Sequence, residues 1–131
     1  IEAAMEIFRE QNRGHLVAVS SVTAVRGMPG NVTTYAATKA GLAALCEGLR
    51  IELKKRRSPI RVTTLYPGYI RTEINEKVKN TPFIVDAQTG CRAMVKAIEA
   101  GKAEHFVPAW PWAPIGFVLR RLPESVLAKL F

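Results

Sequence analysis

Residues 34–66 read TYAATKAGLAALCEGLRIELKKRRSPIRVTTLY, and this stretch decides the fold. Its first part has helical periodicity, with alanine and glycine crowded beside a face of leucines. The pattern predicts a helix over residues 34–56, because the Ser-Pro step that follows cannot continue it. Residues 60–66 are then apolar and β-branched, as in a buried strand. The leucines of the expected face are Leu42, Leu45, Leu49 and Leu53.

The same alternation continues on both sides of this unit. Residues 1–12 have the pattern of a helix, with Gly14 placed to cap it, and residues 15–20 have that of a buried strand. Downstream, a helix is expected over residues 86–100 and a short strand over residues 104–108. Helices and strands that alternate in this way predict an α/β fold, in which right-handed crossovers join the strands of a parallel sheet.

The expected organisation is one α/β unit over residues 1–108 and a tail over residues 109–131. The tail combines aromatic, apolar and basic residues, which suits a helix lying at a membrane surface. The alternative is an arm that closes over a substrate pocket or contacts a second subunit. Ile1 falls inside a helical pattern already under way, so we expect the chain to be cut from a longer sequence.

The composition is that of a globular protein. The 131 residues are 48% hydrophobic and 23% charged, and they contain no apolar run of about 18 residues that could span a membrane. The net charge is +8, but the basic cluster at residues 50–61 has no nucleic-acid-binding motif around it, so nucleic acid is not an expected partner. Cys46 and Cys91 lie among apolar neighbours and are predicted to be buried free thiols, which favours the cytoplasm. No residue spacing indicates a metal site.

The residues best suited to chemistry are Tyr35 and Lys39. They are four positions apart at the start of a helix and therefore share one face. A cation beside a phenol stabilises the phenolate, which can then act as a general acid or base at a carbonyl or alcohol group. Ser20 and Ser21 end a buried strand, where parallel α/β sheets place their sites, so a serine hydroxyl could position a substrate oxygen beside the phenol.

Together these residues resemble the short-chain dehydrogenase/reductase family. The resemblance rests on Leu16-Val-Ala-Val-Ser-Ser21, Tyr35-Ala-Ala-Thr-Lys39-Ala-Gly-Leu and Ile60-Arg-Val-Thr-Thr-Leu-Tyr-Pro-Gly-Tyr-Ile-Arg-Thr72, in this order. It implies the C-terminal half of a Rossmann domain, a doubly wound parallel sheet, with the N-terminal glycine-rich βαβ units missing. It also implies an NADP or NAD cofactor, and the residues that select between the two are absent from this chain.

The resemblance implies a role for each candidate residue. Ser21 would orient the substrate, Tyr35 would donate or accept the proton, and Lys39 would favour the ionised Tyr35 and hold the cofactor ribose. In many members of the family the serine precedes the tyrosine by 13 residues, whereas Ser21 precedes Tyr35 by 14. Val22 stands at the shorter spacing but has no hydroxyl, so Ser21 is the candidate. The cofactor-binding residues implied are Tyr35, Lys39, Pro67, Gly68, Ile70 and Thr72.

The resemblance also bears on substrate and partners. It places a variable substrate loop at residues 73–90, where Phe83 and Ile84 are expected to line an apolar pocket and to bind substrate together with Ser21. The expected substrate is a small carbonyl or alcohol compound of hydrophobic, lipid-like character. A homo-oligomer is expected through the helix at residues 34–56, and the tail could add peripheral membrane contact.

The predicted function is the NAD(P)-dependent interconversion of a carbonyl and a secondary alcohol, with Tyr35 as the general acid/base. This activity is expected only in the full-length protein, and this chain alone is expected to be inactive. The alternative is a non-catalytic, truncated remnant of the family that acts as an interaction or dimerisation module.

Overall fold

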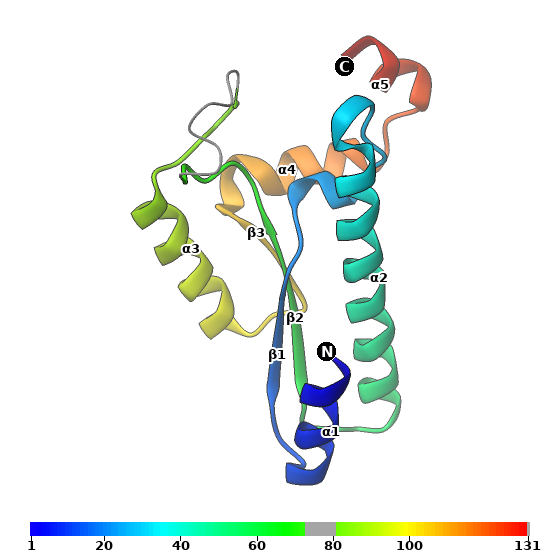
Figure 1. The fold of residues 1–131 in the computed structure, drawn as a ribbon, viewed down its shortest axis with the longest axis vertical. Helices are drawn as coiled ribbons and strands as arrows, with labels where there is room; N and C mark the ends of the chain where they lie inside the picture. Colours follow the sequence, from blue (N-terminus) through cyan, green and yellow to red (C-terminus); the bar gives the residue numbers. More distant parts are fainter. Residues whose placement is uncertain (73–80, 131) are drawn as a thin grey trace.

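The computed structural model describes residues 1–72 and 81–130. At its centre is a sheet of three parallel strands in the order β1-β2-β3, which Figure 1 shows running through the middle of the molecule. Strand β2 is central, and its residues 62–66 are buried. The predicted α/β class with a parallel sheet is therefore confirmed. The strands are β1 (His15–Val19), β2 (Arg61–Pro67) and β3 (Glu104–Val107).

Helices cover both faces of the sheet, so the fold has three layers. Figure 1 shows α1 and α2 on one side of the sheet, α3 on the other, and α4 crossing near the ends of the strands. Every helix and strand expected from the sequence is present within about two residues of its predicted bounds. The helices are α1 (Glu2–Gln11), the 3-10 helices η1 (Val22–Val25) and η2 (Gly30–Val32), α2 (Thr33–Lys55), α3 (Ala87–Ala100), α4 (Ala109–Leu119) and α5 (Glu124–Leu130).

The core under α2 differs from the predicted leucine face at one position. Leu42, Leu49 and Leu53 pack toward the sheet, but Leu45 is 51% exposed. Cys46 takes its place and is fully buried. The spacing explains the exchange, because positions 42, 46, 49 and 53 follow the helical repeat more closely than a series through 45.

The ends of α3 agree with the sequence, whereas the end of α1 does not. The Asp86 carboxylate accepts hydrogen bonds from the Thr89 N–H at 2.9 Å and from the Thr89 hydroxyl at 2.6 Å, which caps α3. Helix α1 ends at Asn12, which adopts the left-handed conformation expected of Gly14. Gly14 serves a different purpose: a Cβ there would lie 2.2 Å from the ring of Phe8.

The predicted burial of both cysteines is half wrong. Cys46 is buried, but Cys91 is exposed on α3. Other apolar residues of α3, Ala97 and Ile98, belong to the core on the other face of the sheet, together with Leu65. Cys91 lies in the first turns of α3 and is not among the residues of this helix that pack in that core.

The tail folds into two helices, and α4 packs on β3. Gly116 lies so close to Phe106 that a Cβ at this position would be 2.5 Å from the ring. Just beyond α4, the Arg120 guanidinium lies 3.8 Å from the Glu104 carboxylate. The tail is thereby attached to the sheet at two points. Across the described part of the chain, no helix has both the length and the apolar character needed to cross a bilayer.

Candidate active site

The ends of β1 and β2 and the first turn of α2 enclose a cavity of about 250 Å³. Ser21 enters its wall just after β1, and Tyr35 enters from α2. The turn after β2 supplies residues 67–70 on another side. Segments far apart in the sequence thus meet at the carboxyl end of a parallel sheet, the edge where such folds bind ligands.

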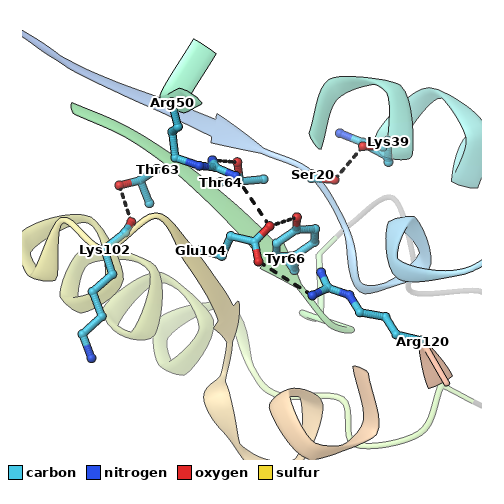
Figure 2. Close-up of polar contacts among 9 residues, drawn as sticks. All are labelled: Ser20, Lys39, Arg50, Thr63, Thr64, Tyr66, Lys102, Glu104 and Arg120. Atoms are coloured by element: carbon cyan, nitrogen blue, oxygen red, sulfur yellow. Dashed lines mark hydrogen bonds and ion pairs between the residues drawn. The ribbon is translucent and has the colours of Figure 1, made fainter. Parts of the chain in front are cut away.

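The two neighbouring serines have different surroundings. The Ser20 hydroxyl donates a hydrogen bond to the Lys39 carbonyl oxygen at 2.9 Å, drawn in Figure 2, and so ties β1 to α2. The Ser21 hydroxyl oxygen accepts from the Thr23 N–H at 3.2 Å and from the Thr23 hydroxyl at 3.0 Å. Of the two, it is Ser21 that lines the cavity beside Tyr35.

Tyr35 and Lys39 lie one turn apart on α2, as the sequence predicts. Tyr35 is 48% exposed. The Lys39 ammonium lies 5.7 Å from the centre of the Tyr35 ring and donates a hydrogen bond to the Val19 carbonyl oxygen at 2.9 Å. This bond anchors the cation at the end of β1, next to the phenol. An ammonium group has three donors, so this bond leaves two for a further ligand.

The turn after β2 is held by backbone hydrogen bonds. The Gly68 N–H donates to the Val107 carbonyl oxygen at 2.9 Å, which continues the sheet beyond β2. The Arg71 N–H then donates to the Val85 carbonyl oxygen at 2.8 Å, which fixes the chain just after Ile70. Thr72 lies beyond the cavity wall and is exposed. Of the predicted cofactor-binding residues, Pro67, Gly68 and Ile70 therefore line the cavity with Tyr35.

A second, larger cavity of about 480 Å³ adjoins the first. Phe83 lines this cavity, as expected. Ile84, which was also expected to line an apolar pocket, is half-buried and is not among the residues that line this cavity. The part of the expected substrate loop at residues 73–80 lies outside the described residues. The sequence analysis did not predict most of the residues that line this cavity. One signal was available, because a helix such as α4 that is apolar on all sides is expected to be buried on at least one side. The missed residues include Val22, Met28, Val32, Trp112, Ile115 and Leu119.

A separate polar cluster lies on the α2 side of the sheet (Figure 2). The buried Tyr66 phenol donates to the Glu104 carboxylate at 2.7 Å, and Arg50 lies 3.6 Å from the same oxygen. Burial, and then the hydrogen bond to Glu104, raises the pKa of Tyr66 well above its usual value. Arg120 stacks over the Tyr66 ring at 5.7 Å. This cluster joins α2, β2, β3 and the end of α4.

The two histidines do not form a site. The His15 ring is hydrogen-bonded to the Thr63 hydroxyl at 2.8 Å, and burial followed by the nearby Arg61 lowers the pKa of His15. Within residues 1–72 and 81–130, no three His, Cys, Asp or Glu side chains gather in a way that could hold a metal ion.

Comparison with known proteins identifies the family. Residues 1–82 match the short chain dehydrogenase family. An uncharacterized oxidoreductase of Mycobacterium tuberculosis is 47% identical over 129 residues, which are 98% of this chain and 50% of that protein. An uncharacterized oxidoreductase of Myxococcus xanthus is 35% identical over 86% of this chain and 42% of its own. The chain therefore belongs to the short-chain dehydrogenase family, and it spans about half the length of the curated relatives it matches.

Solved structures agree with this assignment. A short chain dehydrogenase from Burkholderia cenocepacia in complex with NADP superposes with a TM-score of 0.77 at 26% identity, over 98% of this chain and 52% of that one. A 4-hydroxyisoleucine dehydrogenase complexed with NADH has a TM-score of 0.60 at 23% identity, over 81% of this chain and 49% of its own, and shows the fold alone. The predicted partial Rossmann fold is confirmed.

Proposed function

We propose that this chain carries the proton-transfer half of a nicotinamide-dependent oxidoreductase that interconverts a carbonyl and a secondary alcohol. The observation that carries the proposal is that Ser21 and Tyr35 line one cavity, with the Lys39 ammonium fixed beside the Tyr35 ring. The relatives named as oxidoreductases and the NADP-bound structural neighbour support it. Because the chain spans half of its relatives, the activity is proposed for the complete protein, and the chain alone is proposed to be inactive.

In carbonyl reduction, this chain positions the substrate and supplies the proton. Among the described residues, the Ser21 hydroxyl oxygen acts as the acceptor in both of its side-chain hydrogen bonds. Its own hydrogen can therefore be donated to the carbonyl oxygen of the substrate. Tyr35 transfers its phenolic proton to that oxygen, and Lys39 stabilises the negative charge left on the phenol. When bound, the nicotinamide supplies the hydride to the carbonyl carbon in reduction and takes it back in oxidation.

The residues present fit the nicotinamide end of the cofactor. The turn at residues 67–70 presents backbone to the cavity that holds Tyr35, so main-chain groups could meet the carboxamide there. The two ammonium donors of Lys39 that its bond to Val19 does not use could meet ribose hydroxyls. We propose NADP or NAD without choosing between them. We also propose that a second copy of the protein docks against α2 and that the tail makes peripheral contact with a membrane.

The test is Tyr35→Phe in the complete protein. Loss of the proton donor is expected to lower kcat for a methyl ketone such as butan-2-one by about 10²–10⁴-fold. Tyr66→Phe is the matched control, since it removes a phenol that lies outside the cavity. Consumption of reduced nicotinamide reports the rate. If Tyr35→Phe reduces the ketone within twofold of wild type, or no nicotinamide binds, the remnant interpretation replaces this one.

A further inference from the structure

The two cavities share walls. Val22, Val32 and Tyr69 line both the cavity of about 250 Å³ at Ser21 and the cavity of about 480 Å³ beside it. A molecule with its reacting carbon near Tyr35 would therefore extend its substituent into the larger space. A volume of this size falls within the range of pockets that enclose a drug-sized ligand.

The larger cavity is lined by apolar side chains from three directions. The loop before α2 contributes Met28 and Pro29, and the segment before α3 contributes Phe83. Helix α4 contributes Ile115 and Leu119. Apart from the Thr23 hydroxyl, the Tyr69 phenol and the Trp112 indole N–H, the side chains of this wall are hydrocarbon or thioether. Such a wall stabilises hydrocarbon and offers few partners to charged groups.

Aromatic rings form one end of the cavity. The Trp112 ring is 5.9 Å from the Tyr69 ring and 5.9 Å from the Phe83 ring, and both pairs meet edge to face. Trp112 is only 6% exposed. Edge-to-face packing of this kind stabilises the mutual positions of the three rings at this end of the cavity.

Helix α4 is oriented with one face to this cavity and another to the outside. Trp112 and Leu119 line the cavity, whereas Val118 is 51% exposed. Contact of Gly116 with Phe106, and of Arg120 with Glu104, attaches the helix to β3. The inward face is therefore held in position by the contacts of α4 and Arg120 with β3.

We propose that α4 forms the specificity wall of the active site, and that the site takes carbonyl or alcohol substrates with a long alkyl or flat aromatic substituent. This inference rests on the proposed function, because it places the reacting carbon at Tyr35. Each methylene that enters the cavity is expected to raise kcat/KM by about fourfold until the space is filled. The residues that set the preference are Trp112, Ile115 and Leu119 on the inner face of α4.

The kinetic test uses the complete protein and two ketones, butan-2-one and 2-decanone. Wild type is expected to prefer 2-decanone by 10²-fold or more in kcat/KM. Leu119→Trp, which fills the cavity, is expected to lower the ratio of kcat/KM for 2-decanone to kcat/KM for butan-2-one at least tenfold. Val118→Trp adds the same bulk to the outer face and is expected to change neither. Leu119→Asn keeps the number and branching of the side-chain heavy atoms, and it tests the apolar wall if the larger side chain prevents folding.

A binding test separates this inference from the proposed chemistry. With fluorinated tryptophan incorporated, 2-decanone added without cofactor is expected to shift the ¹⁹F resonance of Trp112, assigned by its loss in Trp112→Phe, and not that of the exposed Trp110. If neither ketone is reduced while the Trp112 signal shifts, the proposed chemistry is wrong and the pocket stands. If butan-2-one is reduced but chain length has no effect and Trp112 does not respond, the pocket inference is overturned.

Discussion

Gly68 is a site where one added methyl group is expected to disturb both the turn after β2 and the apolar cavity. A Cβ at Gly68 would lie 2.0 Å from Trp112 Nε1 and 2.3 Å from its Cε2. Since ordinary contact begins at 3.4 Å, the indole or the turn must move by about 1.4 Å in Gly68→Ala. The indole N–H has no hydrogen-bond partner among the described atoms, so the penalty is steric. Overpacking of this kind costs about 1–3 kcal/mol.

Urea unfolding followed by circular dichroism measures this change in the free energy of unfolding of the complete protein. Gly48→Ala is the matched control, because a Cβ there meets nothing within 4 Å in the middle of α2. That control is expected to stabilise the protein by up to about 1 kcal/mol through helix propensity. The double variant Gly68→Ala, Trp112→Phe should lose less free energy of unfolding than the sum of the losses in the two single variants. If Gly68→Ala changes neither the free energy of unfolding nor the ¹⁹F resonance of Trp112, the close contact between Gly68 and Trp112 is refuted.

Two further predictions concern stability. Tyr66→Phe removes a 2.7 Å hydrogen bond to the Glu104 carboxylate and is expected to cost about 1.5–3 kcal/mol at neutral pH, measured by the same unfolding assay. Because the pKa of Tyr66 is raised in the folded state, wild type should lose stability as pH rises above about 10, and the variant should lose less. Asp86→Ala removes the cap of α3 and should lower Tm at pH 7. Since hydrogen bonds from Thr89 lower the pKa of Asp86, that difference should shrink below pH 3.8, whereas an Asp86→Asn cap should not respond to acid.

Local sequence patterns were sufficient for the order and approximate bounds of the three strands and of α1, α2 and α3. The strand expected at residues 15–20 is His15–Val19, and the helix expected at residues 34–56 is Thr33–Lys55. Both predictions rest on side-chain periodicity and on residues that stop an element, which act over a few positions. The exposure of Leu45 shows the limit of that reasoning, because one step along a helix turns a side chain by about 100°.

The candidate site could be predicted only in part, because its composition depends on distant contacts. The motif residues Ser21 and Tyr35 meet in one cavity because parallel strands end at a common edge. Nothing near Gly68 in the sequence indicates that Trp112, 44 positions later, covers it. The different surroundings of Ser20 and Ser21 likewise follow from the position of Lys39 on a neighbouring helix.

The placement of α4 connects the two ends of the candidate site. Trp112 touches Gly68 in the turn proposed to meet the nicotinamide, and it also lines the cavity proposed for the substrate. Arg120, at the far end of the same helix, is held by Glu104 and the Tyr66 ring. Because α4 is attached at both Trp112 and Arg120, changes at either of these two residues should alter KM for cofactor and substrate together. A tail that contributed only a surface for partners would leave both values unchanged.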